Sequence, residues 1–290
     1  MSPKNEMQEN EIKKKEIKEL LARHGFRFSK SMGQNFLTDA EIPERIAEAA
    51  RLTRETHALE IGPGIGALTA SLCRRAGFVT AVELDAALLP ILSETLRDFE
   101  NYEIVRGDAL KLGLRELMAR RNEPRLAACA NLPYNITAPA VAALLEAGIF
   151  ETVTVMVQRE VARRFCARPG TADYGAFTVF VNYHADTEAL FDVDPESFMP
   201  APKVVSSVVR MTPRAPEAEI GDELFFFRVV KAAFSQRRKT LVNALASGGF
   251  GTKDAIFNAV ADCGIEPLAR GETLGITEFA ELARRLAKLR

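Results

Sequence analysis

Between residues 58 and 157 the chain alternates short apolar runs with longer segments of helical periodicity, and this alternation limits the possible folds more than any other feature. Strands separated by helices pair in parallel, because each helix carries the chain back to the same edge of the sheet. The expected strands are 58–61, 78–82, 102–105, 126–130 and 152–157, with helices over 65–75, 86–99, 110–121 and 138–147. The pattern predicts an α/β, Rossmann-like parallel sheet with helices on both faces.

The alternation weakens on either side of this region. The first twenty residues, rich in Glu and Lys, predict an exposed helix or a frayed tail, and 41–50 predicts a helix. The runs 176–183 and 204–211 are rich in strand-forming residues and favour an antiparallel hairpin. We therefore expect the parallel sheet to continue into an antiparallel edge.

The last third of the chain predicts a second domain. Two prolines within 212–216 interrupt both helix and strand, which is typical of a linker. Helical periodicity returns over 224–246, 253–263 and 278–289. The predicted organisation is a sheet domain over 1–212, with an N-terminal extension over 1–26, followed by a small all-helical domain over 213–290.

Composition excludes several classes of protein. Lys and Arg together number 38 against 39 Asp and Glu, so the net charge of -1 gives no global sign of a nucleic-acid partner. The four cysteines are far apart in the sequence and form no Cys-x-x-Cys pair, which argues against a zinc site or a redox motif. No apolar run is long enough to span a membrane, and the polar N-terminus lacks the apolar core of a secretion signal. We expect a cytoplasmic protein without a metal ion.

A glycine cluster follows the first expected strand, within residues 60–66. Gly62 and Gly64 would let a ligand approach the backbone closely. The spacing Gly-x-Gly-x-Gly differs from the Gly-x-Gly-x-x-Gly of dinucleotide-binding proteins, and a tight structural turn explains this motif alone equally well.

Two acidic residues strengthen the interpretation as a ligand site. Glu83 ends the second strand, 21 positions after Gly62, close to the spacing expected of an acid that binds ribose hydroxyls. Asp108 follows the third strand. Each acid alone could cap its strand end, but the carboxyl ends of parallel strands meet at one edge. Together with the glycines they predict a pocket for a ligand that carries a nucleoside.

The segment Asn131-Leu132-Pro133-Tyr134 follows the fourth strand and is typical of amino-methylation of nucleic-acid bases. An adenine N6 amine is a poor nucleophile, because its lone pair is delocalised into the ring. The Asn131 side-chain oxygen and the Leu132 carbonyl could accept its two N–H bonds and favour a pyramidal, attacking amine. Pro133 would fix the backbone and Tyr134 could stack on a flipped base. The alternative is a strand-to-helix turn with a buried tyrosine.

Positive charge gathers locally despite the neutral total. Residues 159–168 hold four arginines and one acid, and 224–253 hold six basic residues and no acid. Basic side chains would contact RNA phosphates, although a charge run can also be a solvated helix face.

Phe198 either supplies a second stacking surface for the base or packs in the core.

These residues closely resemble the KsgA/RsmA family of small-subunit rRNA adenine N6,N6-dimethyltransferases. The resemblance covers nearly the whole chain and includes the segments 33–37, 60–66, 107–109, 131–137, 158–160, 200–204 and 234–241. The glycine turn is shared by many methyltransferases, whereas the Gln-Asn-Phe-Leu and Asn-Leu-Pro-Tyr segments narrow the choice to RNA adenine enzymes. The resemblance implies a class I methyltransferase fold with S-adenosyl-L-methionine as cofactor.

The resemblance also implies roles for individual residues. Asn35 and Leu37 would hold the methionine and sugar side of the cofactor, Glu83 the ribose, and Asp108 the adenine amino group, while Asn131 would contact cofactor and target amine. The full expected cofactor set is Gln34, Asn35, Leu37, Gly62, Gly64, Glu83, Leu84, Asp108, Ala109 and Asn131. The expected catalytic set is Asn131, Leu132, Pro133, Tyr134 and Phe198. The expected RNA-binding set is Arg159, Arg163, Lys203, Arg237, Arg238 and Lys239.

The family's substrate would be the rRNA of the immature 30S subunit, where two adjacent adenosines near the 3′ end of 16S rRNA become N6,N6-dimethyladenosine. A monomeric enzyme is the simplest expectation. The alternatives are an adenine methyltransferase for large-subunit rRNA, one for DNA, and a ribosome-assembly factor that has lost its activity. The basic segment near residue 237 argues against the first of these, and the intact Asn131–Tyr134 segment against the last.

Overall fold

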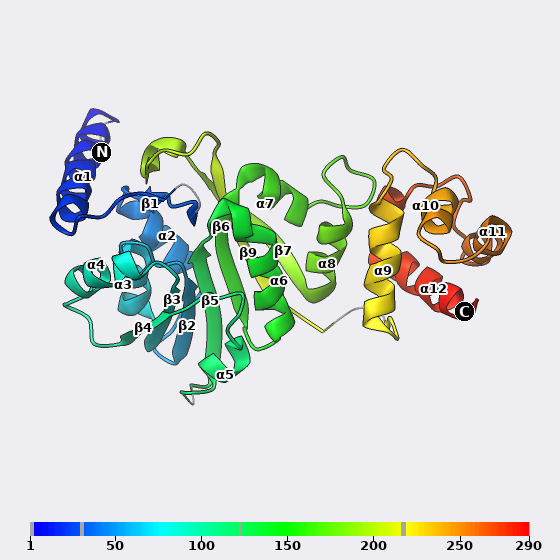
Figure 1. The fold of residues 1–290 in the computed structure, drawn as a ribbon, viewed down its shortest axis with the longest axis horizontal. Coiled ribbons are helices and arrows are strands. Elements are labelled where there is room, and N and C mark those ends of the chain that lie inside the picture. Colours follow the sequence, from blue (N-terminus) through cyan, green and yellow to red (C-terminus); the bar gives the residue numbers. More distant parts are fainter. Residues whose placement is uncertain (1–2, 30–31, 122, 216–218, 290) are drawn as a thin grey trace. The chain divides into compact units, whose positions relative to one another are not determined.

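The computed structural model describes residues 3–29, 32–121, 123–215 and 219–289. A seven-stranded sheet has the order β4-β3-β2-β5-β6-β9-β7 (Figure 1). Its strands are β2 (Thr56–Ile61), β3 (Phe78–Glu83), β4 (Tyr102–Arg106), β5 (Arg125–Asn131), β6 (Thr152–Gln158), β7 (Ala185–Val193) and β9 (Ser206–Pro213). The strands β2 to β6 are parallel to their neighbours among themselves, and β9 runs antiparallel to β6. The predicted α/β fold with a parallel sheet is confirmed.

Helices connect the parallel strands. The helices of the N-terminal two thirds of the chain are α1 (Pro3–Arg23), α2 (Glu41–Ala49), α3 (Ala67–Arg75), α4 (Leu89–Thr95), α5 (Leu114–Met118), α6 (Thr137–Ala147), α7 (Arg159–Phe165) and α8 (Ala176–His184), of which α3 to α6 lie between successive parallel strands. Further along are α9 (Glu223–Phe234), α10 (Leu241–Ser247), α11 (Lys253–Asp262) and α12 (Ile276–Ala287). A short antiparallel pair joins β1 (Phe36–Leu37) to β8 (Phe198–Met199).

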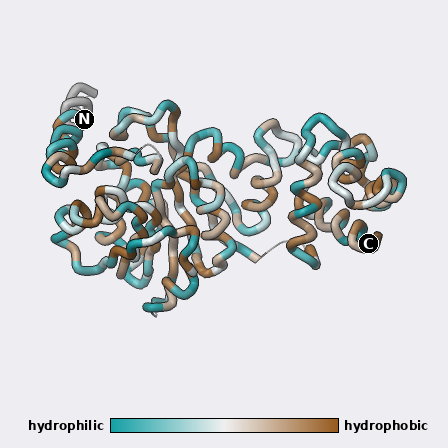
Figure 2. Tube along the Cα trace, viewed as in Figure 1, coloured by the Kyte–Doolittle hydropathy of each residue, from teal (hydrophilic) through white to brown (hydrophobic). Residues whose placement is uncertain are grey.

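The core of the sheet lies around β2, in which all six residues are buried. Because the strand is covered on both faces, its apolar residues Ala58, Leu59 and Ile61 are buried, and so are its polar residues Thr56, His57 and Glu60. The apolar side chains of α2 and α3 pack with β2, β3, β6 and β9 in one cluster. Figure 2 shows hydrophobic residues along the central strands.

The chain divides into two compact units. Unit 1 comprises Met1–Ala162 and Thr187–Pro213, and unit 2 comprises Arg163–Asp186 and Arg214–Arg290. The chain enters unit 2 a second time after Pro213, and Arg163–Asp186 groups with the C-terminal helices, which no sequence pattern indicated. The division into a sheet domain over 1–212 and a helical domain over 213–290 stays a prediction. Pro216 of the predicted linker lies outside the described residues.

The prediction of a strand over 176–183 is wrong, because this segment forms α8. Nearly every residue in it is apolar, so periodicity could not distinguish a buried strand from a buried helix. Val179 and Tyr183 of α8 pack in one cluster with Phe226 of α9, and Thr178 donates a hydrogen bond to the Arg164 carbonyl at 2.7 Å. Tertiary packing decides the conformation here. The other expected edge strand is confirmed as β9, whose outer neighbour is β7.

The single helix expected over 224–246 is also wrong, because it is two helices. Helix α9 begins at an Asp222 cap, whose carboxylate accepts from the Phe225 N–H at 3.0 Å, and ends at Phe234. Helix α10 begins only at Leu241. The basic triplet at 237–239 therefore lies in the intervening loop and not on a helix face.

The N-terminal segment is a packed helix rather than a frayed tail. Ile17 and Leu21 of α1 are buried in one cluster with side chains from β1, α4 and the glycine turn. Beyond the helix end, His24 contacts Glu94 of α4 through Nε2 and Oε2, 2.7 Å apart, and Arg23 pairs with the same carboxylate. Within the described ranges no helix is both long and apolar enough to cross a membrane.

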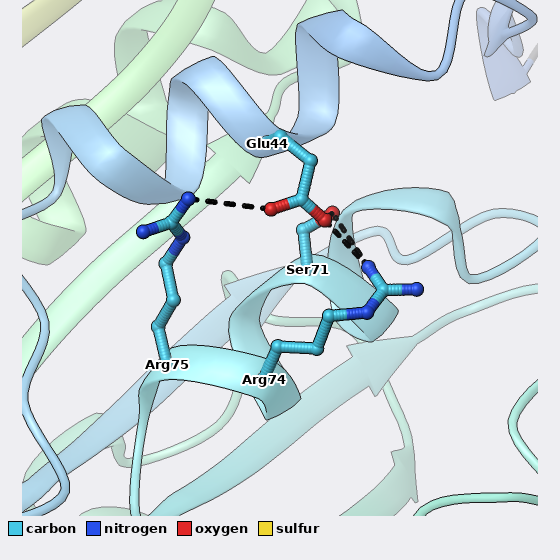
Figure 3. Close-up of polar contacts among 4 residues, drawn as sticks. All are labelled: Glu44, Ser71, Arg74 and Arg75. Carbon is cyan, nitrogen blue, oxygen red and sulfur yellow. Dashed lines mark hydrogen bonds and ion pairs between the residues drawn. The ribbon is translucent and has the colours of Figure 1, made fainter.

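A polar cluster ties α2 to α3 on the surface (Figure 3). The Glu44 carboxylate accepts from the Ser71 hydroxyl at 2.8 Å and pairs with the guanidinium groups of Arg74 and Arg75. Burial alone would raise the pKa of Glu44, but the Ser71 hydrogen bond and the two arginine charges outweigh it and lower the pKa below 4.5. The carboxylate form is therefore favoured by folding.

We predict that Glu44→Gln lowers the free energy of unfolding by less than about 1 kcal/mol at neutral pH, because the side chain is partly exposed and screened by water. A carboxyl with a depressed pKa contributes stability above its ordinary pKa of 4.5, which is lost as the pH falls through the folded value. Urea unfolding of parent and variant should therefore converge at acid pH. Glu48→Gln, an exposed acid on the same helix, should change nothing at either pH. An equal loss for Glu44→Gln at both pH values would contradict the assignment.

Candidate functional site

A cavity opens at the carboxyl ends of β2, β3 and β5. It is lined by the loop before β1, the glycine turn after β2, the ends of β3 and β5, and the turn after β4. All ten residues expected to bind a cofactor line it, namely Gln34, Asn35, Leu37, Gly62, Gly64, Glu83, Leu84, Asp108, Ala109 and Asn131. Leu132, Pro133 and Tyr134 of the expected catalytic set line it too.

The cavity follows from the strand order. The chain leaves β2 toward β3 and β4 on one side, then crosses back to β5 and β6 on the other. The two halves of the sheet therefore diverge next to β2 and β5, and loops there leave a crevice outside the carboxyl ends of the strands.

The glycine turn brings bare backbone to the cavity wall. Gly62 and Gly64 have φ values of 71° and 60°, in the left-handed region where side chains are disfavoured. A Cβ added to Gly64 would lie 3.1 Å from the Phe36 ring, whereas one on Gly62 would meet only Pro133 Cδ, at 3.9 Å. Gly64 is thus required by packing as well as by conformation, and Gly62 by conformation.

Glu83 lies at the end of β3 and is 5% exposed. Its carboxylate accepts from two backbone N–H groups, that of Asp85 at 2.7 Å and that of Gly64 at 3.4 Å. Burial raises the pKa of Glu83, and the two N–H groups oppose that rise. The carboxylate is held rigidly against the glycine turn, with lone pairs left for a ligand.

Asp108 follows β4 at the next position along the same edge. Its carboxylate accepts from the Leu110 N–H at 3.0 Å and lies 3.5 Å from the Lys111 amine. These contacts anchor the turn that places Ala109 in the cavity wall. Across the described ranges, no three His, Cys, Asp or Glu side chains come together in a way that could hold a metal ion.

Asn131 ends β5 and faces the loop that precedes β1. Its side-chain Nδ2 donates to the backbone carbonyl of Asn35 at 3.2 Å. The next residue, Leu132, donates its N–H to the Met156 carbonyl, also at 3.2 Å. The Pro133 carbonyl accepts from the Ile136 N–H and the Thr137 hydroxyl, so this turn is braced from both sides.

Tyr134 starts the 3-10 turn after Pro133, and its hydroxyl lies 2.8 Å from the hydroxyl of Ser206 on β9. Burial raises the pKa of Tyr134, and the Ser206 hydrogen bond only partly opposes it. The phenol is therefore neutral at physiological pH, and its ring is held in a fixed position. Ser206 could not be predicted from the sequence, because no motif distinguishes it from its neighbours.

Phe198 does not line this cavity. It is 2% exposed and packs with Leu37 and Ile46 in the cluster that covers the sheet, while its backbone pairs with Leu37 in the β1–β8 ladder. The alternative of a core phenylalanine describes its place in this structure. A stacking role for Phe198 stays a prediction.

The residues expected to bind RNA are distributed over both units. Arg159 and Lys203 belong to unit 1, and Arg163, Arg237, Arg238 and Lys239 to unit 2. All six are exposed. Arg159 lies 3.5 Å from Asp192, and Arg237 pairs with Glu272 and donates to the Ala172 carbonyl. In the described part of the chain Arg238 and Lys239 make no ion pair, which leaves their charges open to a partner.

Glu60 also lines the cavity, and no role was predicted for it from the sequence. It is 1% exposed, and its Oε2 has no hydrogen-bond partner among the described residues. Burial raises the pKa of Glu60 to about 8, with the nearby Thr69 hydroxyl opposing and the Glu83 charge adding to the rise. Its position just before the glycine turn was the available signal. At neutral pH the group is predominantly protonated.

We predict a stability that falls with rising pH because of Glu60. The folded state keeps a proton that the unfolded chain releases above its ordinary pKa of 4.5, so the free energy of unfolding decreases as the pH rises from 4.5 toward 8. At about 1.4 kcal/mol per pKa unit, this group accounts for a loss on the order of 4 kcal/mol across that range.

Glu60→Gln should remove this part of the pH dependence, as measured by urea unfolding at a series of pH values. Glu55→Gln is the matched control, an exposed acid next to the opposite end of β2. Parallel stability curves for the parent and Glu60→Gln would show that Glu60 does not hold a proton in the folded state.

Comparison with known proteins identifies the family. The family model described as ribosomal RNA adenine dimethylase matches residues 25–288. The chain is 46% identical over 279 residues to Ribosomal RNA small subunit methyltransferase A of Geobacillus thermodenitrificans, covering 94% of this chain and 95% of the relative. It is 45% identical over 268 residues to the protein of the same name from Geobacter metallireducens, covering 91% and 98%.

Solved structures agree with this assignment. The 23S rRNA methyltransferase ErmE matches with a TM-score of 0.65 and 30% identity, over 87% of this chain and 99% of that one. A dimethyladenosine transferase from Plasmodium falciparum has a TM-score of 0.72 at 23% identity, over 87% and 98%, and supports the fold. The cavity lies where the two halves of the sheet diverge, at the carboxyl ends of β2 and β5. The chain belongs to the ribosomal RNA adenine dimethylase family and is an S-adenosylmethionine-dependent methyltransferase.

Proposed function

We propose that this protein methylates the N6 amine of two adjacent adenosines near the 3′ end of small-subunit rRNA, to N6,N6-dimethyladenosine. The observation that carries the proposal is the Asn131–Tyr134 turn, which faces the same cavity as the glycine turn and the Glu83 carboxylate. The relatives with 45–46% identity over more than nine tenths of the chain are named as small-subunit rRNA methyltransferases, which supports the choice of subunit.

The cavity suits S-adenosylmethionine in the chemistry of its walls. The Glu83 carboxylate would accept hydrogen bonds from the ribose hydroxyls, and Asp108 from the adenine amine, while Leu84 and Ala109 offer apolar surface to the adenine ring. Space above Gly62, where a Cβ would meet nothing closer than 3.9 Å, would admit the methionine part. When bound, the cofactor supplies a methyl group on a positively charged sulfonium, which is a strong electrophile.

Asn131 would orient the target amine. Its Nδ2 is engaged with the Asn35 carbonyl, which fixes the amide orientation and assigns Oδ1 as the acceptor. An amine that donates one hydrogen to Oδ1 turns its lone pair away from the ring plane and toward the methyl group. The contribution is one of positioning and charge placement, since the bond is set before the reaction begins.

The Leu132 carbonyl would accept the second hydrogen of the amine. The Pro133 carbonyl is already used by Ile136 and Thr137, so it is not the acceptor. The Pro133 ring restricts its own φ to -54°, which holds the preceding peptide in place. The amine becomes acidic only after it has attacked, so no strong base is required, in keeping with the absence of a free basic group among the turn residues.

Tyr134 would stack on the flipped adenine. Its ring is held by the Ser206 hydrogen bond at 2.8 Å, and a neutral phenol costs nothing to keep beside an uncharged base. The proposal has four further parts, which rest on the sequence resemblance. The substrate would be the immature 30S particle, and the C-terminal helices would recognise its RNA. The protein would be a monomer located in the cytoplasm.

The proposal predicts that the parent transfers labelled methyl from S-adenosylmethionine to immature small subunits, with dimethyladenosine as product after nucleoside analysis. Asn131→Ala should lower kcat by roughly 100- to 1000-fold, the usual cost of removing one preorganised polar contact. Asn258→Ala, on the exposed face of α11, should leave kcat unchanged. Label in large-subunit rRNA alone would overturn the substrate, and parent-like activity of Asn131→Ala would overturn the catalytic role.

A second prediction concerns RNA affinity. Arg238→Ala and Lys239→Ala should each weaken binding to small-subunit rRNA and reduce the slope of log K against log salt by roughly 0.7–0.9, the value for one lost phosphate contact. Arg120→Ala, which removes an equal charge at an exposed position just after α5 in unit 1, is the control. Binding can be measured by filter retention at a series of salt concentrations. An unchanged slope for both variants would place the phosphate contacts elsewhere.

A further inference from the structure

Gln34 was expected to bind the cofactor, yet its side-chain amide is engaged within the protein. Its Nε2 donates to Asp85 Oδ2 at 2.9 Å, and its Oε1 accepts from the Ser29 N–H at 3.2 Å. The amide therefore joins the loop before β1 to the turn that follows β3. Both contacts lie in unit 1, and Gln34 itself lines the cavity.

Each end of this bridge reaches a residue with a proposed role. Asp85 donates its N–H to Glu83 Oε1 at 2.7 Å, and its own Oδ1 caps the Ala87 N–H at 3.0 Å. On the other side, the residue after Gln34 offers its carbonyl to Asn131 Nδ2 at 3.2 Å. A continuous path of hydrogen bonds and one peptide link thus runs from the ribose-binding carboxylate to the catalytic amide.

The path is short enough to transmit a displacement. Neighbouring Cα atoms are held about 3.8 Å apart by a planar peptide, so a shift of Gln34 carries the Asn35 carbonyl with it. That carbonyl is what sets the orientation of the Asn131 amide. A misplacement of roughly 1 Å at a reacting group can cost on the order of 100-fold in rate.

We propose that Gln34 is a positioning residue, which through the Asn35 carbonyl holds Asn131 in the orientation required for methyl transfer and ties it to the turn that begins at Glu83, beside the cofactor pocket. The proposal rests on the proposed function and adds to it a residue that acts without touching the reacting atoms.

The pair can be reversed without disturbing its other contacts. In Gln34→Glu a carboxylate faces the Asp85 carboxylate, while its second oxygen still accepts from Ser29. Adding Asp85→Asn restores a bond of opposite direction, with the new amide as donor, and returns the net charge to that of the parent. The Asn oxygen can still cap Ala87. Gln34→Glu combined with Asp98→Asn restores the charge at an exposed site and leaves the pair broken.

The measurements are kcat with saturating cofactor, the cofactor Kd by calorimetry, and the thermal midpoint of each variant. We expect Gln34→Glu to lower kcat at least about tenfold with the cofactor Kd changed less than about threefold, and Gln34→Glu/Asp85→Asn to recover most of the loss. The Asp98 control should not recover it. Gln34→Met removes the hydrogen bonds to Asp85 and to Ser29 without adding charge. If Gln34→Glu folds poorly, this variant tests whether kcat falls while the cofactor Kd stays nearly unchanged.

Three outcomes overturn the inference. A raised cofactor Kd with unchanged kcat, and no rescue by Asp85→Asn, would make Gln34 a direct cofactor ligand. Equal recovery by the Asp85 and Asp98 variants would reduce the effect to charge alone. Parent-like kcat in both Gln34 variants would show that Asn131 is held without this bridge. A parent that methylates no adenine would instead refute the proposed function, so the two failures are distinguishable.

Discussion

The parallel pairing of β2 with β3 on one side and β5 on the other is the constraint on which the site depends. The ladders align Ile61 with Val82, and Glu60 with Cys129, so the three strands end at nearly the same level. The segments that leave these ends are the glycine turn, the Glu83 segment and the Asn131–Tyr134 turn. Their side chains converge because the backbone hydrogen bonds of the sheet leave them no other register.

Much of this arrangement could be predicted from the sequence, for an identifiable reason. Parallel strands that are buried on both faces have largely apolar sequences. Glycines and acidic residues follow the ends of these strands, where the glycines adopt turn conformations that other residues disfavour. Glu83 and Asp108 could therefore be assigned to the same edge of the sheet from the sequence alone. Their convergence with Asn131 needs only the rule that parallel strands share a carboxyl end.

The features that escaped prediction depend on contacts between distant residues. The 176–183 run could have been strand or helix, and it is a helix because Val179 and Tyr183 pack against α9. Ser206 braces Tyr134 across 72 positions, and Asp85 binds Gln34 across 51, so no local pattern could indicate either. Glu60 was visible in the motif, but its unpaired oxygen and raised pKa come from complete burial, which a sequence does not display.

The division of the chain into units has a consequence for its synthesis. The chain passes between the units at 162/163, 186/187 and 213/214, so no single backbone cut separates one from the other. The antiparallel partner of β6 arrives only with β9, about fifty residues later, after the first segment of unit 2 has been made. In a nascent chain, one edge of β6 therefore stays unpaired while α8 is synthesised. Helix α8 in turn lacks its packing partner until α9 has been synthesised. Unit 1 can therefore close its sheet only after the first segment of unit 2 has been made, and unit 2 can be completed only when the helices α9 to α12 have followed.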